Sequence, residues 1–202
     1  MIRTIAVLLL AIAPVCSANN KYTETRSQSW QFSGGRVELR LKAGDVHVLP
    51  ATKPHQLVIR YTLESDDADF ASKVKTDFEV NSSNAELRLQ SPNHGSTDVY
   101  LEVPRGTDVY IRDFAGDVTI DGIEGNQDVQ AFAGDIHLDL PPASTFYRVD
   151  ASTRVGDIDD SPFGTPKGWI GKKIRFRGRG EYKLHVHVFA GDILFSTLSA
   201  KR

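Results

Sequence analysis

Hydrophobic and polar residues alternate along most of this chain. In one clear example, Val37, Leu39 and Leu41 are separated by charged residues. The same period of two recurs at 57–63, 87–89, 99–103 and 184–188. This period places every second side chain on one face of a β-strand. The pattern therefore predicts an all-β chain whose strands each bury one face.

One segment breaks this alternation. Between residues 66 and 78, Phe70, Val74 and Phe78 follow one another at four-residue spacing, and Asp66 stands where a helix N-cap is expected. Apolar residues three or four apart lie on the same side of an α-helix. We therefore predict one short amphipathic helix over 66–78.

The tripeptide Gly-Asp-(Val/Ile) occurs five times within a longer repeat. The five pairs are Gly44 with Asp45, Gly116 with Asp117, Gly134 with Asp135, Gly156 with Asp157, and Gly191 with Asp192. The best copies cover 109–160 and 182–196, and two of them are eighteen residues apart. Repeats of about twenty residues with short strands are typical of β-solenoids. The sequence predicts a short β-solenoid, a β-helix-like stack of repeated rungs, after an N-terminal β-region.

Each Gly-Asp pair is interpreted as a structural turn at the corner of a rung. Glycine tolerates a positive φ, and the aspartate carboxylate can accept backbone N–H groups that close the turn. A row of carboxylates from Asp117, Asp135, Asp157 and Asp192 is also chemically suited to calcium. The paired glycines and nine-residue period of calcium-binding solenoids are not present, so the turn interpretation is preferred.

Two aromatic features are expected to pack. Phe114, Phe132 and Phe189 occupy the same place in three repeats, and we interpret them as a buried stack between rungs, since exposed phenylalanine is uncommon. An exposed ladder would instead suit sugar stacking. The glycine- and proline-rich segment 161–171 is expected to form a loop that packs Trp169 over one end of the stack.

The N-terminus has the features of a secretory signal peptide. Arg3 precedes an apolar run at 5–15 that is too short to span a bilayer, and small residues follow it. We predict a signal peptide at 1–18, cleaved after Ala18, and a single domain at 19–202. The protein is then exported to the periplasm or beyond the cell. The alternative is lipid anchoring through Cys16.

The formal net charge of −2 favours no class of partner, but its distribution is uneven. Acidic residues dominate 108–160 and basic residues dominate 167–183. The candidate binding residues are Lys172, Lys173, Arg175, Arg177 and Arg179. Alternating with apolar positions on a strand, they would form a basic stripe for an anionic envelope component. The alternative is an edge strand that charge protects against pairing between molecules.

No metal or other cofactor is predicted. His185 and His187 lie two apart and would share one strand face, which makes them weak candidates for zinc or copper. A third ligand would have to come from His137 or Asp139, on a neighbouring rung.

We also predict no enzymatic activity, since the chain has no nucleophile elbow, zinc-protease motif, phosphate loop or dinucleotide fingerprint. The alternative is a carbohydrate-binding or carbohydrate-active protein that uses Asp117, Asp135 and Asp139. Nucleic acid is not an expected partner of an exported protein. The expected partner is a cell-envelope component or another protein.

The order of these motifs resembles a bacterial family of putative adhesins of unknown function. The resemblance rests on the Val-Tyr-Leu-Glu-Val-Pro segment at 99–104, the successive Gly-Asp units, and a final unit at 182–193. It covers about 35–196, and its specificity comes from repetition and order. The copy at Gly156 departs from the pattern, with Arg154 and Val155 in place of Phe-Ala. The resemblance implies a β-solenoid in an envelope-associated protein and supplies no catalytic residues.

Overall fold

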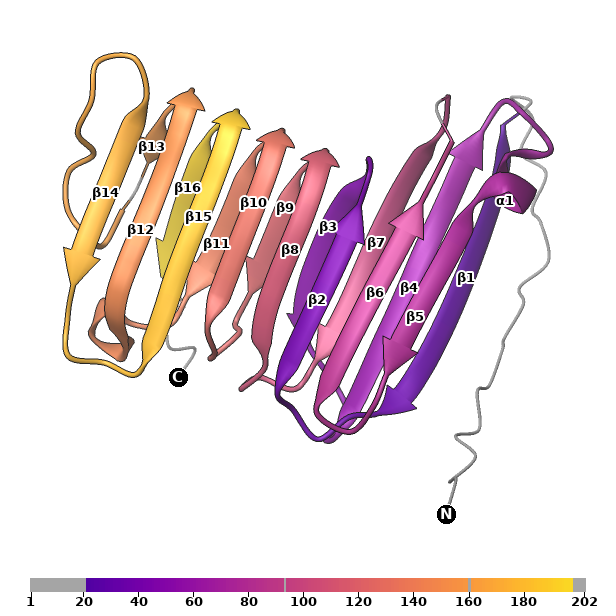
Figure 1. The fold of residues 1–202 in the computed structure, drawn as a ribbon, viewed down its shortest axis with the longest axis horizontal. Coiled ribbons are helices and arrows are strands. Elements are labelled where there is room, and N and C mark those ends of the chain that lie inside the picture. The colour runs from indigo at the N-terminus through magenta and orange to yellow at the C-terminus, as the bar shows by residue number, and fades with distance from the viewer. Residues whose placement is uncertain (1–20, 93, 160, 198–202) are drawn as a thin grey trace.

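The computed structural model describes residues 21–92, 94–159 and 161–197, which form two eight-stranded sheets (Figure 1). Sheet A has the order β1 (Tyr22–Gln31), β4 (Gln56–Ser65), β7 (Ser96–Val103), β3 (Asp45–Pro50), β9 (Val118–Asp121), β11 (Ile136–Leu140), β16 (Ile193–Thr197) and β13 (Ile158–Asp159). Sheet B has the order β14 (Lys172–Arg177), β12 (Phe146–Val155), β15 (Tyr182–Ala190), β10 (Gln127–Ala133), β8 (Asp108–Ala115), β2 (Arg36–Leu41), β6 (Asn84–Gln90) and β5 (Lys75–Val80). The all-β prediction is confirmed.

Each Gly-Asp pair lies where the chain leaves sheet B and enters sheet A. The five units are β2–β3, β8–β9, β10–β11, β12–β13 and β15–β16, and they pair in parallel. The eighteen-residue offset is the pairing register, because Ile111 lies opposite Val129 and Val118 opposite Ile136. The spatial order differs from the chain order, since the last unit lies between the units of Gly134 and Gly156.

The two sheets lie one behind the other (Figure 1), and their inward side chains form one core. Along sheet B the inward row includes Leu39, Ile111, Val129 and Val186, all fully buried. The alternation seen in the sequence produces this row, because strands paired in register place their apolar residues side by side. Removing apolar surface from water stabilises the fold by roughly 25 cal/mol per Å².

Antiparallel strands flank the parallel units. At the N-terminal end, β4 pairs with both β1 and β7, and β5 pairs with β6 on the edge of sheet B. At the other end, β14 pairs with β12 and is the opposite edge of sheet B. The chain also contains α1 (Phe70–Lys73) and the 3₁₀ turn η1 (Ala143–Thr145).

The predicted helix is much shorter than expected. Helix α1 covers only Phe70–Lys73 and follows Asp69 rather than Asp66, while the residues from Lys75 onward belong to strand β5. Phe78 packs against Trp30 and Tyr61, with ring centroids 6.0 and 6.2 Å apart. Strand pairing with β6 and these ring contacts outweigh a local helical period that one turn cannot sustain.

The prediction that Trp169 packs over one end of the stack is wrong. Its side chain is 95% exposed, and Phe163 from the same loop is buried instead. The ring of Phe163 lies 5.5 Å from that of Phe146 and 5.7 Å from that of Phe195. The Ser161 hydroxyl accepts the N–H of Phe163, which fixes the turn just after β13. Phe163 therefore reaches the gap between the sheets, whereas Trp169 lies just before the edge strand β14.

The predicted signal peptide and Cys16 lie outside the described residues. Within the part of the chain that the structure describes, no helix is long and apolar enough to cross a membrane.

Candidate functional site

The five repeated glycines occupy a backbone conformation that other residues rarely adopt. Their φ angles lie between +125° and +146°. A Cβ atom on Gly116, Gly134, Gly156 or Gly191 would overlap the carbonyl group of the glycine on the neighbouring unit. Glycine is therefore required both by the turn and by the close spacing of adjacent corners.

The repeated aspartates connect neighbouring corners. The carboxylate of Asp45 accepts the backbone N–H of Asp117 at 2.9 Å, and that of Asp117 accepts the N–H of Asp135 at 2.8 Å. The series continues from Asp135 to Asp192 at 2.8 Å and from Asp192 to Asp157 at 2.7 Å. These bonds join adjacent units rather than closing each turn on itself. Among the five repeated aspartates in the described residues, only Asp157 also accepts the backbone N–H of the next residue in its own turn.

The histidines and aspartates do not assemble into a metal centre. His185 and His187 lie on β15 in sheet B, whereas His137 and Asp139 lie on β11 in sheet A. The proposed third ligand is therefore on the other sheet, because each repeated unit has one strand in sheet B and one in sheet A. His187 Nδ1 lies 3.0 Å from the Ser152 hydroxyl. In the described residues, no three His, Cys, Asp or Glu side chains are grouped to hold a metal ion.

The three acidic residues of the carbohydrate alternative have separate surroundings. Asp117 and Asp135 accept corner N–H groups, while Asp139 accepts a hydrogen bond from the Ser196 hydroxyl at 3.1 Å. Asp139 lies opposite Asp121 in sheet A. Burial, together with the negative charge of Asp139, raises the pKa of Asp121. These bonds are structural, and no substrate geometry emerges from them.

The five basic candidates do not share one surface. Lys173, Arg175 and Arg177 alternate with Ile174 and Phe176 on β14, so they project from the outer face of sheet B. Lys172 comes one residue before Lys173, so its side chain lies on the opposite face of the strand, where its ammonium is 3.9 Å from the Asp157 carboxylate. Arg179 follows the end of the strand.

Strand β14 itself is an edge strand, which also fits the alternative that its charges prevent pairing. The side chain of Arg175 is 73% exposed and 3.8 Å from Asp150. Although partial burial of Asp150 opposes its ionisation, the hydrogen bond from Arg148 and the charges of Arg148 and Arg175 lower its pKa.

The expected burial of the phenylalanine stack is wrong, because the stack is exposed. Phe114, Phe132 and Phe189 are 57%, 46% and 37% exposed, and neighbouring rings are parallel with centroids 4.9 Å apart. Each ring follows directly on an inward-facing residue, as Phe132 follows Ala131, and alternation therefore turns it outward. We call these three residues the phenylalanine ladder.

The stacking limits what the ladder can bind. The faces of Phe132 are covered by its two neighbours, and the outer side of Phe189 has the Arg154 guanidinium carbon 5.9 Å from its centroid. Along most of its length the ladder therefore presents ring edges to the outside as an apolar ridge, and only the outer face of Phe114 is covered by neither another ladder ring nor Arg154. Sugar rings stack on aromatic faces, so this arrangement does not favour the sugar-stacking role considered for an exposed ladder.

A row of cationic and neutral polar side chains runs directly beside the ladder. Pairing across sheet B aligns Arg88, Arg40, Arg112, Gln130, His187, Ser152 and Lys173, which we call the cation row. None of these seven residues is acidic, but on the edge strand β5 the position opposite Arg88 is Asp77, whose carboxylate lies 3.9 Å from the Arg88 guanidinium. The other acidic partners of the row, such as Glu38 with Arg40 at 2.6 Å and Asp128 with Arg112 at 3.1 Å, lie two positions back along the strands, on the side away from the ladder.

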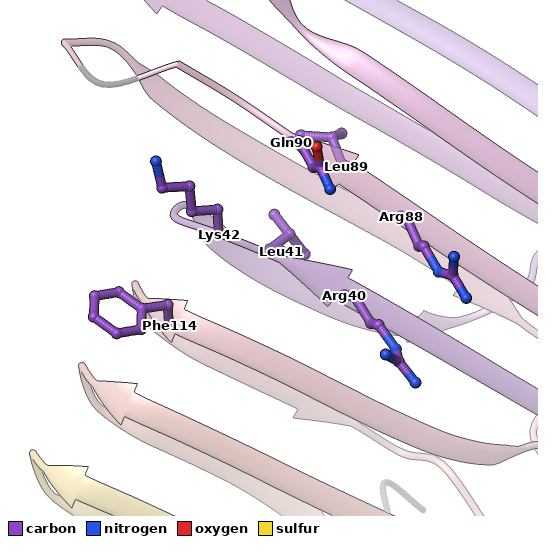
Figure 2. Close-up of a pocket in the computed structure, with 7 residues that line it drawn as sticks. All are labelled: Arg40, Leu41, Lys42, Arg88, Leu89, Gln90 and Phe114. Carbon is purple, nitrogen blue, oxygen red and sulfur yellow. The ribbon is translucent and has the colours of Figure 1, made fainter.

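Grooves lie at both ends of the ladder. The first is lined by Arg40, Leu41, Lys42, Arg88, Leu89, Gln90 and Phe114 (Figure 2). Figure 2 shows the Arg40 and Arg88 side chains projecting from adjacent strands, with Lys42 and Phe114 toward the strand ends. The second groove is lined by Ser152, Thr153, Arg154, Ile170, Gly171, Lys172, Lys173, His187 and Phe189. The apolar ridge thus has cationic side chains at both ends.

The sequence reasoning missed the cation row, although a signal for it exists. The fourth residue before each repeated glycine is Arg40, Arg112, Gln130, Ser152 or His187. None of these five residues is acidic, in a region otherwise rich in acidic residues. Comparing the repeats column by column would have identified this position. Arg88 and Lys173 could be added only from the structure, since they come from antiparallel or non-repeated parts.

No family model matches the chain, and no curated protein matches it. Among solved structures, the chain is similar to a putative cell adhesion protein from Clostridium sporogenes, with a TM-score of 0.50 and 12% identity over 86% of this chain and 100% of that one. A putative adhesin from Bacteroides fragilis aligns with a TM-score of 0.35 and 11% identity over 85% and 97% of the two chains. A putative lipid binding protein from Parabacteroides distasonis aligns with a TM-score of 0.25 and 9% identity over 88% and 97%.

At 12% identity, the likeness to the Clostridium sporogenes protein shows a shared fold. This shared fold agrees with the adhesin-like resemblance of the sequence.

Proposed function

We propose that this protein is a non-catalytic, exported module of the cell envelope that binds an anionic surface through the outer face of sheet B. The observation that carries the proposal is the cation row, which has no acidic member from β6 to β14 and runs beside an exposed apolar ridge. Lys173, Arg175 and Arg177 extend this face onto the edge strand. A signal peptide at 1–18 and a single domain at 19–202 complete the proposal.

The parallel units are proposed to form a short β-solenoid that acts as a scaffold for this face. Support comes from the corner bonds between successive aspartates and from the in-register pairing of successive units in both sheets. A rigid stack holds one position of every unit in a straight row. Such a row suits an extended or planar partner better than a small molecule, which is usually enclosed in a cavity.

The test is co-sedimentation of the protein with phosphatidylglycerol vesicles, phosphatidylcholine vesicles and isolated cell-wall material across a salt series. We expect pelleting with the anionic material that weakens as salt rises, because screening shortens the range of charge attraction. Changing Arg175→Glu and Arg177→Glu together should weaken binding at low salt by at least about tenfold, since each basic residue near an anionic surface contributes about 1 kcal/mol.

A matched control is Lys53→Glu with Arg60→Glu, which makes the same change in net charge at exposed residues away from sheet B. The control should bind as the wild type does. Equal loss in both double variants would show that only net charge matters, and salt-independent pelleting would contradict the proposal.

A further inference from the structure

The largest exposed apolar side chains cluster near one end of sheet B. Besides the phenylalanine ladder, Trp169, Ile170 and Val155 are 95%, 79% and 59% exposed. Folded proteins keep contiguous apolar surface small unless it meets a partner. An almost fully exposed tryptophan beside an exposed isoleucine is therefore a feature that needs a function.

Ile170 connects this loop to the ladder. Ile170 lines the same groove as Phe189 and Arg154, and Arg154 lies over the ring of Phe189. The loop that contains Trp169 runs to the end of the molecule where β14 begins, and β8, β10, β15 and β12 end there as well (Figure 1). Through Ile170 the loop therefore adjoins the Arg154 end of the phenylalanine ladder, and Trp169 is the next residue toward the N-terminus.

We propose that Trp169 and Ile170, together with the edges of the phenylalanine ladder, insert into the interface of an anionic phospholipid bilayer. This inference rests on the proposed function and specifies its partner. Tryptophan prefers the headgroup region, where its ring is buried and its N–H stays hydrated. Isoleucine and the phenylalanine edges would enter the adjoining acyl boundary, as the apolar side of an interfacial element does.

Charge complementarity identifies the bilayer as the occupant. Arg154 and Lys173 line the groove that includes Ile170, and Lys167 is exposed in the same loop. Basic residues around an apolar tip match the phosphates that surround the acyl region of an anionic membrane. A soluble anionic polymer would use the basic residues but would leave Trp169 in water.

The corner aspartates restrict how the protein can be oriented on the membrane. Asp117, Asp192 and Asp157 are exposed at the turns, one step beyond the ladder and toward sheet A. Their charges would repel an anionic membrane that approached the corners end-on. The bilayer must therefore meet the outer face of sheet B, where the ladder separates the cation row from the corner carboxylates.

The experiment uses tryptophan fluorescence, because the two tryptophans differ in exposure. Trp30 is 8% exposed and Trp169 is 95% exposed, so a Trp30→Phe variant reports Trp169 alone and a Trp169→Phe variant reports Trp30 alone. If Trp30→Phe does not fold, the difference between wild type and Trp169→Phe gives the Trp169 signal. The probe is a vesicle of phosphatidylglycerol and phosphatidylcholine, with and without brominated acyl chains.

We expect Trp169 emission to shift to shorter wavelength on vesicle addition, to be quenched by brominated lipid, and to be protected from acrylamide. Trp30 should show none of these changes. The variant Trp169→Ser with Ile170→Ser should lose at least about tenfold in vesicle affinity while keeping the thermal unfolding of the wild type, because both side chains are exposed. Tyr100→Ser with Tyr22→Ser is the control for exposed aromatic residues away from this end.

The outcomes separate the two proposals. Salt-dependent binding that requires Arg175 and Arg177, with Trp169 still open to acrylamide, would overturn the insertion and leave the electrostatic function standing. The same result with cell-wall material alone would assign the face to a polymer. Insertion of Trp169 into neutral vesicles with no effect of Arg175 and Arg177 would contradict the electrostatic function and would also overturn the anionic bilayer as the partner.

Discussion

Asp113 brings a carboxyl group into the interior, directly before Phe114 of the ladder. It is 7% exposed; its Oδ1 accepts the N–H of Ala115 at 3.3 Å, while its buried Oδ2 has no hydrogen-bond partner. Burial raises the pKa of Asp113 to about 6. The corresponding inward position on β10 is Ala131, so the unit at Gly116 differs from its neighbour by one buried ionisable group.

This residue gives a prediction for pH-dependent stability. A carboxyl group whose pKa is higher in the folded than in the unfolded state favours folding when protonated, so its contribution is complete below about pH 4 and is lost as the pH rises through about 6. Asp113→Ala should remove this dependence. The difference between the two free energies of unfolding, that of Asp113→Ala minus that of the wild type, should become more positive by about 2–3 kcal/mol from pH 4 to pH 7.

Urea unfolding at a series of pH values measures this difference. Asp66→Ala is the control, because Asp66 is an exposed acidic residue. A constant difference between Asp113→Ala and the wild type from pH 4 to pH 7 would contradict the assignment.

At the scale of the elements, the corner joins two strands and also joins neighbouring units. The backbone N–H of a corner glycine donates to the last strand residue of the next unit in the sheet, as from Gly134 to the Ala190 carbonyl at 3.0 Å. The bonds accepted by the aspartates connect the same pairs of units. The conformation of one turn is therefore fixed by the turn beside it. This coupling explains why the repeat keeps both glycine and aspartate.

Two glycines separate the effect of crowding from that of the backbone angle. Gly134 has φ +125° and is in close contact with the Gly116 carbonyl, whereas Gly164 has φ +111° with open space around it. Gly164→Ala should destabilise the protein by about 1–2 kcal/mol through backbone strain alone. Gly134→Ala should cost at least about 3 kcal/mol, because the neighbouring corner must also move. Thermal and urea unfolding measure both values, and equal losses would show that contact between corners is unimportant.

At the scale of the whole molecule, the last two strands hold the structure together. Strand β15 lies between β10 and β12, and β16 lies between β11 and β13. The C-terminal unit is thus inserted among earlier units, and its contacts join residues far apart in the chain. Contacts of this kind form late, since closing long loops is entropically costly.

Ending the chain at Arg179 should therefore prevent cooperative folding rather than shorten the molecule by one unit. The truncation would expose the inward faces next to Val129 and Ala151 and leave β12 and β14 without their link to β10. Circular dichroism and a thermal scan should show no cooperative transition. A sharp transition with most of the strand signal retained would show that the remaining units fold independently.

The alternation of residues determined the all-β class and which side chains of most strands are buried, because the side-chain period of a strand is two wherever it lies. The repeated Gly-Asp pairs determined where turns fall, since few other residues adopt a positive φ. The eighteen-residue offset indicated which residues would lie side by side in neighbouring units. These features are local or periodic, and the sequence therefore contains them directly.

Tertiary structure decided the features that depend on neighbours distant in the chain. Phe163 rather than Trp169 is buried because only one of them reaches the gap between the sheets. Phe78 belongs to a strand because β6 and Trp30 are available to pair with it. The insertion of β15 between β10 and β12 brings the cation row and the phenylalanine ladder together from separate segments. Composition and periodicity specify how each strand is built, whereas long-range pairing specifies which strands are neighbours and which surfaces they leave exposed.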